Sequence, residues 1–219
     1  MKTMMMYSFK MNESNTMINM NKLTDKMMLI MMLLLMLVSM SMVKTNNMMN
    51  KSVMENQKME MAWTIFPSLI IILMAIMSIP ILYLNNEPKM SMITIKILSN
   101  QWFWSYEYSN FNTSFNSYMM YKKKFNFNIL ETDNKLILPF NMPVMMMMTS
   151  SDVVHSWAVP SMNVKMDNIP GQTNTLIIRS NKMGVTFGQC SEVCGTNHSF
   201  MPVMIETVNT KNFIEWIKK

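Results

Sequence analysis

Cysteine and histidine are rare in this chain, and their placement is the first clue to its chemistry. The sequence contains 2 cysteines and 2 histidines. Cys190, Cys194 and His198 fall within one short stretch, and His155 lies upstream. Met201 follows His198 and adds a thioether, so the five side chains form a set of nitrogen and sulfur ligands. Such soft ligands favour copper, zinc or iron–sulfur centres over magnesium or calcium.

Three interpretations of the cysteine pair compete. The spacing of Cys190 and Cys194 allows a small disulfide, which an oxidising compartment would preserve. The two cysteines and two histidines also match a structural zinc site. Met201 favours copper, because a thioether is a poor zinc ligand but a weak axial ligand in copper electron-transfer sites.

A pair of cysteines, rather than a single one, favours a pair of metal ions. If both thiolates bridge two coppers, each copper can also take one histidine, and a thioether and a backbone carbonyl can fill the remaining positions. Such a centre spreads one electron over two metals. Each bond then changes little on reduction, which suits fast electron transfer and not bond-making chemistry.

These residues resemble the dinuclear copper-A motif of the cytochrome c oxidase subunit II family. The resemblance rests on residues 189–202 together with residues 152–157. It continues in Gln-Trp-Phe-Trp-Ser-Tyr-Glu-Tyr at 101–108 and in Glu-Met-Ala-Trp-Thr-Ile at 60–65. The separated motifs occur in the family's order, so the combined signal is very specific.

The resemblance implies a ligand set and a second metal. The implied copper ligands are His155, Cys190, Glu192, Cys194, His198 and Met201. Glu192 contributes its backbone carbonyl to copper in this family, and its side chain points toward a magnesium ion shared with subunit I.

The resemblance also implies roles for three other residues. Trp102 matches the surface position where electrons from cytochrome c enter the family's domain, although a barrel tryptophan is often simply structural. Glu60 matches the mouth of a proton-uptake path in subunit I, whereas its position alone is equally consistent with an interfacial charge. Asp167 matches an acidic position near the subunit I interface.

Some positions depart from the family pattern, although none of them is a copper ligand. Asparagines stand where acidic residues often help to dock cytochrome c, which predicts a weaker docking charge. These are Asn110, Asn112 and Asn116. Asn100 replaces a usual His, Asn163 a usual Gly, Gln172 a usual Arg and Phe187 a usual Tyr.

Composition restricts the class of protein. The net charge is +6, but charged residues make up only 15% of the chain, which indicates buried or lipid-facing segments. Basic residues are scattered apart from the lysines at 122–124, so we expect no nucleic-acid partner. The 35 methionines follow the apolar segments, where Met fills space as Ile or Leu would. A mitochondrial gene that reads AUA as Met would give this composition.

Two apolar runs predict the membrane anchor. Residues 27–43 and 62–84 carry no charge, and their lengths suit two helices that cross a bilayer as a hairpin, together residues 27–84. Residues 1–26 are polar and predict an extended or poorly ordered lead-in. The resemblance places both termini in the intermembrane space of the mitochondrion, with the connection on the matrix side of the inner membrane.

Residues 85–219 have the pattern of an all-β domain. Short apolar stretches alternate with Asn, Gly and Pro punctuation, which is typical of a sandwich or barrel. The predicted strands are 93–98, 125–130, 136–139, 144–148, 175–178, 185–189 and 203–208, with a short helix at 212–219. The resemblance implies a cupredoxin-like Greek-key barrel.

The sequence therefore predicts a two-helix transmembrane hairpin followed by a copper-A domain. By resemblance, the chain accepts electrons from reduced cytochrome c and passes them to haem in subunit I, where oxygen is reduced to water. The alternative is a membrane-anchored copper-delivery protein, which also uses two cysteines separated by three residues. Glu192 between the cysteines, His198 and Met201 favour the electron-transfer site.

Overall fold

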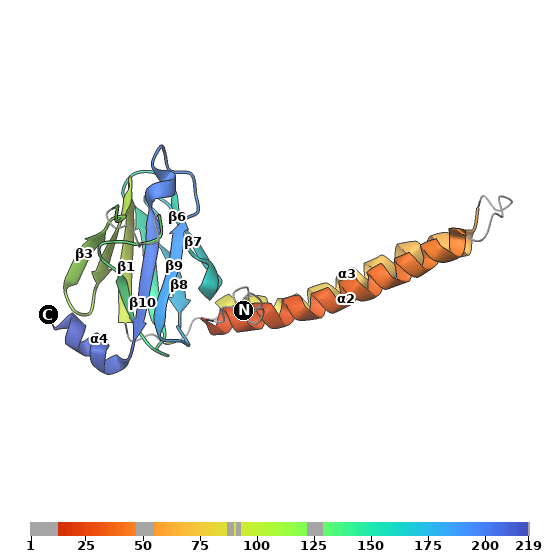
Figure 1. The fold of residues 1–219 in the computed structure, drawn as a ribbon, viewed down its shortest axis with the longest axis horizontal. Coiled ribbons are helices and arrows are strands. Elements are labelled where there is room, and N and C mark those ends of the chain that lie inside the picture. Colours follow the sequence, from red (N-terminus) through yellow and green to blue (C-terminus); the bar gives the residue numbers. More distant parts are fainter. Residues whose placement is uncertain (1–12, 47–54, 87–89, 91–92, 122–128, 219) are drawn as a thin grey trace. The chain divides into compact units, whose positions relative to one another are not determined.

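The computed structural model describes residues 13–46, 55–86, 90, 93–121 and 129–218. The chain forms two compact units. One contains residues 1–18 and 88–219, and the other contains residues 19–87. Figure 1 shows the β-rich unit and the helical hairpin as separate parts of the ribbon. Each unit is described by itself.

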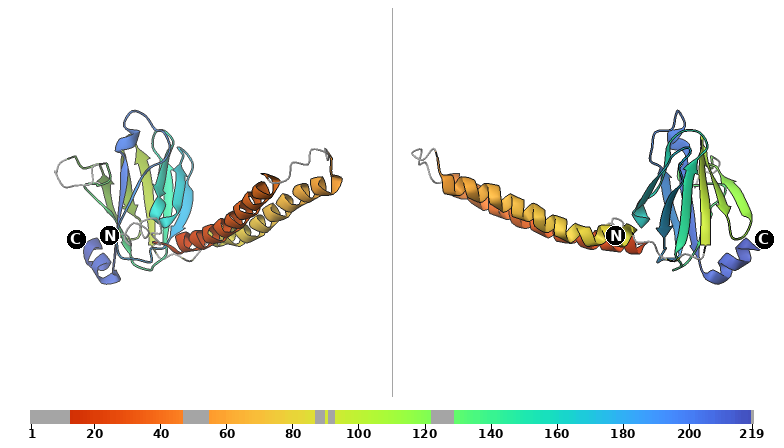
Figure 2. Two further views of the ribbon diagram at one scale, coloured as in Figure 1. Left: turned by 45° about the vertical axis from the view of Figure 1, so that its right-hand side comes forward. Right: turned by 180° about the vertical axis from the view of Figure 1, so that it is seen from behind.

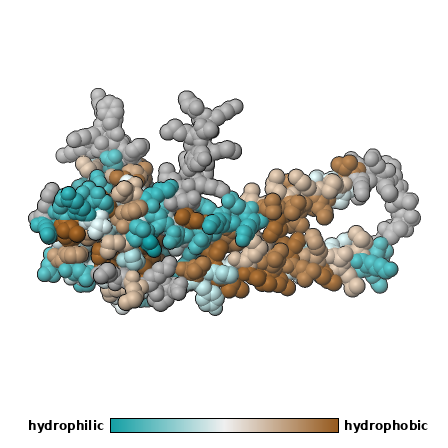
Figure 3. Space-filling view, turned by 90° about the horizontal axis from the view of Figure 1, so that it is seen from below, coloured by the Kyte–Doolittle hydropathy of each residue, from teal (hydrophilic) through white to brown (hydrophobic). Residues whose placement is uncertain are grey.

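The helical unit consists of α2 (Asn15–Asn46) and α3 (Gln57–Asn86), which run side by side in Figures 1 and 2. Both helices are long and apolar enough to cross a membrane, and their apolar side chains are exposed (Figure 3). The Asn56 side chain accepts a hydrogen bond from Met59 N at 3.3 Å and so caps the first turn of α3. The helix continues through Pro67 and Pro80. The predicted hairpin is therefore confirmed, with both helices longer than the uncharged runs.

The N-terminal segment differs from its prediction. Within the described residues the helix begins at Asn15, so the expectation of an extended lead-in up to residue 26 is wrong. Ser14 caps α2 by accepting a hydrogen bond from Met17 N at 3.1 Å, and its hydroxyl donates to Met162 O in the β domain. Asn181 N donates to Glu13 O at 2.7 Å. Residues 15–26 are thus helical although they are polar and lack clear periodicity, because Ser14 caps the first turn and is hydrogen-bonded to the β domain.

The β domain is a sandwich of two five-stranded sheets. The first has the order β3-β2-β1-β5-β8 and the second β4-β10-β9-β6-β7. Strands β1 and β5 pair in parallel, as do β4 and β10, and the other pairs are antiparallel. The strands are β1 (Ile93–Asn100), β2 (Phe103–Tyr108), β3 (Thr113–Ser117), β4 (Leu136–Pro139), β5 (Val144–Ser150), β6 (His155–Val159), β7 (Val164–Asn168), β8 (Asn174–Ile178), β9 (Gly184–Cys190) and β10 (Pro202–Val208).

Six of the seven predicted strands are confirmed, namely β1, β4, β5, β8, β9 and β10. The seventh, at 125–130, lies outside the described residues except for its last two, which form a turn. Strands β2, β3, β6 and β7 were not predicted. Every residue of β6 is buried, so it has no alternation of apolar and polar residues to detect.

The core lies between the two sheets and contains methionine where other proteins use Leu or Ile. Met146 and Met148 of β5 are fully buried, and Met162 is buried in the short 3-10 helix η1 (Pro160–Met162). These positions confirm the reading of methionine as apolar filler. Helix α4 (Thr210–Ile217) packs Phe213 and Trp216 against Tyr108, and Asn209 caps it, accepting from Asn212 N.

Candidate metal centre

Two strands of the second sheet bring the first ligands together. Cys190 is the last residue of β9, and His155 is the first residue of β6. The strands pair with Trp157 opposite Cys190, so the register itself places His155 near the cysteine. Gly188 permits this close pairing, because a Cβ there would lie 2.0 Å from the carbonyl oxygen of Ala158.

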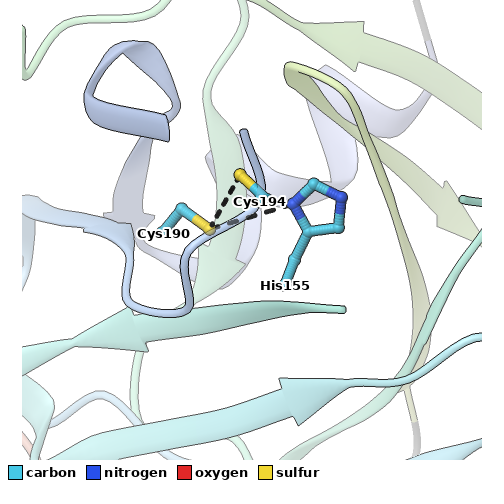
Figure 4. A group of neighbouring side chains, drawn as sticks. All are labelled: His155, Cys190 and Cys194. Carbon is cyan, nitrogen blue, oxygen red and sulfur yellow. Dashed lines mark hydrogen bonds between the residues drawn. The ribbon is translucent and has the colours of Figure 1, made fainter. Parts of the chain in front are cut away.

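The two cysteine sulfurs face each other with an imidazole nitrogen on each side. The Sγ atoms of Cys190 and Cys194 are 3.9 Å apart. His155 Nδ1 lies 3.9 Å from the sulfur of Cys190, and His198 Nδ1 lies 3.5 Å from the sulfur of Cys194. Figure 4 shows the ring of His155 turned toward the two sulfurs. His155, Cys190 and Cys194 are buried, and their ligand atoms all lie within 4.8 Å of one another.

The cysteines are free thiols, which counts against the disulfide interpretation. A disulfide requires a sulfur–sulfur distance of about 2.05 Å. The observed separation leaves room for ions between the sulfurs instead.

The rest of the predicted ligand set lies on the same loop. The thiol of Cys190 is 3.4 Å from the backbone carbonyl oxygen of Glu192, and the side chain of Glu192 is exposed. Cys190 N donates to Met201 O at 3.1 Å, which holds Met201 beside Cys190, and the Met201 side chain is buried. His198 begins the 3-10 helix η2 (His198–Phe200). The structure therefore brings all six predicted copper ligands into one neighbourhood.

Asp152 orients the buried His155 through Nε2, the ring nitrogen that does not face the sulfurs. Its Oδ1 lies 2.9 Å from His155 Nε2, which leaves Nδ1 free to face the sulfurs. Such a carboxylate partner fixes the tautomer and ring orientation of a metal-binding histidine. Burial lowers the pKa of His155, but hydrogen bonds to Cys190 and Asp152 outweigh burial and raise it. Burial raises the pKa of Asp152, whereas hydrogen bonds from His155, Val153 N and Gln101 N lower it overall.

The two thiols differ in acidity although they are neighbours. Burial raises the pKa of Cys190, but hydrogen bonding to His155 and to backbone groups reverses this and lowers it to about 7. Burial and the charge of Cys190 raise the pKa of Cys194 to about 12. One thiolate is therefore readily available at neutral pH, and the second requires an added cation.

Trp102 lies against the metal loop. Gln101 and Trp102 form the two-residue turn between β1 and β2. The Trp102 side chain is half-buried and packs against the core. A Cβ on Gly195 would lie 3.1 Å from Cζ2 and 3.3 Å from Nε1 of Trp102, so the indole reaches the residue next to Cys194. The structure thus places the predicted electron-accepting tryptophan beside the cysteine loop.

The other predicted site residues belong to other elements of the chain. Glu60 is in the first turn of α3, in the helical unit, and is exposed. Asp167 is an exposed residue of β7, 3.9 Å from Lys165 Nζ. Asn163 has φ +54°, a left-handed conformation that asparagine tolerates better than most residues, which explains how it replaces the glycine usual there.

Sequence reasoning missed the two residues that support this loop. Asp152 and Gln101 both belong to the matched motifs, but the sequence predicts no supporting role for either. The Asp-x-x-His spacing of residues 152–155 was the available signal for the first. For Gln101, which donates through Nε2 to Cys194 O at 2.7 Å, the sequence holds no signal, since the partners are 93 residues apart.

The donor set fits a pair of copper ions. It offers two sulfurs facing each other, one imidazole nitrogen beside each, a backbone carbonyl and a buried thioether residue. Soft sulfur and imidazole donors select copper or zinc. Zinc would use the four Cys and His ligands alone and would give no role to Met201. The fold and this site define a membrane-anchored protein with a cupredoxin-like domain that carries a thiolate–imidazole centre.

Comparisons with known proteins agree with this class. The family model described as "Cytochrome C oxidase subunit II, periplasmic domain" matches residues 93–208, and "Cytochrome C oxidase subunit II, transmembrane domain" matches residues 2–81. The chain is therefore a member of the cytochrome c oxidase subunit II family.

Individual relatives cover most of the chain. Cytochrome c oxidase subunit 2 of Lasius sp is 49% identical over 177 residues, 79% of this chain and 78% of the relative. The protein of that name from Oncopeltus fasciatus is 42% identical over 212 residues, 94% of this chain and 93% of the relative. The solved periplasmic domain of subunit II of cytochrome oxidase of Bradyrhizobium japonicum is 39% identical with a TM-score of 0.56, covering 60% of this chain and 94% of that one.

Proposed function

We propose that this chain is the electron-accepting subunit of a mitochondrial cytochrome c oxidase. It takes electrons one at a time from reduced cytochrome c and passes them to haem in subunit I. Oxygen is reduced to water there, coupled to proton pumping. The anchor lies in the mitochondrial inner membrane, and the β domain faces the intermembrane space. Membership of the family supports this proposal for the whole chain.

One observation carries the proposal at the level of chemistry. The Cys190 and Cys194 sulfurs are 3.9 Å apart, and each has one histidine Nδ1 within 3.9 Å. Cys190 with His155 and Cys194 with His198 would hold two ions in similar surroundings, each offering one sulfur and one imidazole nitrogen. A dinuclear copper centre bound there supplies a one-electron relay whose charge is spread over two metals.

The chain's own residues prepare the site for that role. Burial of Cys190, Cys194 and His155 excludes water from the ligand atoms. Asp152 holds the Nε2 side of His155, so the ring cannot rotate away from the sulfurs. The β6–β9 register fixes one side of the site on rigid strands, which limits rearrangement when the charge changes. Electron transfer benefits because little structure has to move.

Three finer assignments belong to the same proposal. Trp102, half-buried and against Gly195, accepts the electron from cytochrome c. The exposed carboxylate of Glu192 suits a magnesium ion shared with subunit I, because oxygen ligands are those that magnesium prefers. Glu60, near the start of a membrane-spanning helix, forms the mouth of a proton-uptake path in subunit I.

Electron paramagnetic resonance of the copper-loaded chain tests the central assignment. A mixed-valence pair that shares one electron gives a seven-line copper hyperfine pattern, whereas a single copper gives four lines. We expect seven lines and two coppers per chain. A four-line spectrum would instead favour a copper-delivery protein that holds one ion.

A further inference from the structure

The turn between β1 and β2 joins the two parts of the chain that carry the candidate ligands. Asn100 and Phe103 are the last paired residues of this hairpin, so Gln101 and Trp102 form its tip. One neighbour of the tip is the segment that leads to His155. The other is the loop that contains Cys194. Three segments distant in sequence therefore meet at one residue pair.

On the histidine side, the contact runs through Asp152. The backbone N–H of Gln101 donates to Oδ2 of Asp152 at 2.6 Å. The other carboxylate oxygen lies 2.9 Å from Nε2 of His155. One carboxylate thus fixes both the hairpin tip and the ring of a candidate ligand.

On the cysteine side, the contact is made by the Gln101 side chain. Its Nε2 donates to the carbonyl oxygen of Cys194 at 2.7 Å. The next residue, Gly195, has φ +133° and lies so close to the tip that a Cβ there would be 3.2 Å from Gln101 Nε2 and 3.1 Å from Trp102 Cζ2. The absence of a side chain at Gly195 allows the loop backbone to approach the indole.

Most residues of the loop around Cys194 are exposed among the residues that the structure describes. Residues 191–193 are exposed, and Val193 is 80% exposed. Residues 195–197 are exposed as well. Because these side chains bury little surface within the described part of the chain, a hydrogen bond to the Cys194 carbonyl should have a correspondingly large effect on the position of this segment.

We propose that Gln101 is a positioning residue that holds the Cys194–Gly195 segment against the Trp102 indole. Its carboxamide keeps the electron-accepting ring and the metal loop at one fixed separation, while Asp152 keeps the hairpin tip in register with His155. The hydrogen bonds of Gln101 to Asp152 and to the Cys194 carbonyl are called the clamp below. The inference rests on the proposed function of the site, because it assigns the clamp to electron transfer from Trp102. No part of the clamp is itself a metal ligand.

Gln101→Met tests this role in the full-length chain, because Met has a similar shape but no N–H donor. Gln172→Met is the matched control: Gln172 is also exposed, and its Nε2 donates to Asn174 Oδ1 at 2.8 Å, outside the metal loop. In the metal-free chain, amide hydrogen exchange at 191–198 should become about fivefold faster in Gln101→Met, because a neutral hydrogen bond contributes about 1 kcal/mol. The control should leave exchange at 191–198 unchanged.

The copper-loaded chain provides the second measurement. Reduction by saturating cytochrome c should slow by up to about fivefold in Gln101→Met, because the loss of about 1 kcal/mol lowers the population of the clamped state by at most that factor. Reduction by a small outer-sphere ruthenium amine, which needs no tryptophan, should match wild type. Copper content and the hyperfine pattern should be unchanged. A residue that merely supported the fold would affect both reductants alike.

Three outcomes would overturn the clamp: unchanged exchange at 191–198, an unchanged rate with cytochrome c, or equal slowing with both reductants. None of them coincides with failure of the proposed function, which would appear as a wild-type chain without the seven-line spectrum. The exchange measurement needs no metal, so it stands in either case.

Discussion

Trp102 and Trp104 are two residues apart on the β1–β2 hairpin, yet the structure predicts opposite consequences for their replacement. Trp104 is fully buried, and its ring meets His155 edge-on with centroids 6.2 Å apart. Trp102 is half-buried at the hairpin tip, and its indole lies along Gly195. We expect Trp102→Leu to impair electron transfer and Trp104→Leu to impair stability.

Burial sets the size of the stability effects. Truncating a fully buried tryptophan costs about 3–5 kcal/mol, and leucine restores part of the volume, so Trp104→Leu should cost about 3 kcal/mol. Trp102 is only partly buried, so Trp102→Leu should cost less, about 1.5 kcal/mol. For a domain of this size the melting temperature should fall by roughly 12 °C and roughly 6 °C respectively.

Stopped-flow reduction beside a thermal melt separates the two roles. The melt is best made on the metal-free chain, because a tightly bound metal breaks two-state behaviour. Trp102→Leu should keep its copper and its spectrum, since no ligand is altered, while its reduction within the cytochrome c complex slows by orders of magnitude. Normal reduction of Trp102→Leu in a strongly destabilised domain would refute the electron-accepting role and make Trp102 a structural residue like Trp104.

Further predictions concern the ligands, the pH dependence and the docking of the partner. Cys190→Ser or Cys194→Ser should abolish the seven-line spectrum, because in the proposed centre each sulfur would bind both ions; a variant that keeps the spectrum would contradict the proposal. Met201→Leu should keep two coppers but shift the reduction potential, since a weak axial ligand tunes it, and an unchanged potential in voltammetry would remove Met201 from the ligand set. Copper affinity, measured against a competing chelator, should rise about tenfold per pH unit between about pH 8 and 9. In this range Cys190, with a pKa of about 7, is already ionised, whereas Cys194, with a pKa of about 12, must lose its proton when copper binds. A copper affinity that does not change with pH would contradict these acidities. The on-rate of cytochrome c, a basic protein, should fall only shallowly with salt, because Glu107 is already paired with Lys96 at 2.9 Å, and a salt-independent rate would exclude electrostatic docking.

The proximity of most candidate ligands could be predicted from the sequence because they are neighbours in the chain. Cys190, Glu192, Cys194, His198 and Met201 lie close together in the sequence, and the residue types of the cysteines, the histidine and the methionine indicate soft ligands, whereas Glu192 was included only through the family resemblance. The strands with apolar runs were predicted for a similar reason, since their pattern needs no knowledge of neighbours. The polar or fully buried strands lack such a pattern. Strand β6, which carries His155, is among those missed.

The support of the site could not be predicted, because it depends on pairs that are distant in the chain. Gln101 contacts Asp152 across 51 residues and Cys194 across 93. Only the folded sheets bring these groups together. The helical start at Asn15 was missed for a related reason, since Ser14 is held by Met162 of the β domain. In both cases a polar residue gains its structural role from a partner that the local sequence does not specify.

The arrangement of the candidate ligands supports the proposed role in electron transfer over metal delivery. A delivery protein must release its metal, which favours exposed ligands on mobile segments. Here His155, Cys190, Cys194 and Met201 are buried, and His155 and Cys190 stand at the ends of two paired strands. The loop that carries the other ligands is held at Cys194 from the β1–β2 turn. Because His155 and Cys190 are already in place on paired strands, a centre bound there would gain affinity from preorganisation on that side and would have little freedom to rearrange at these two ligands when its charge changes by one electron.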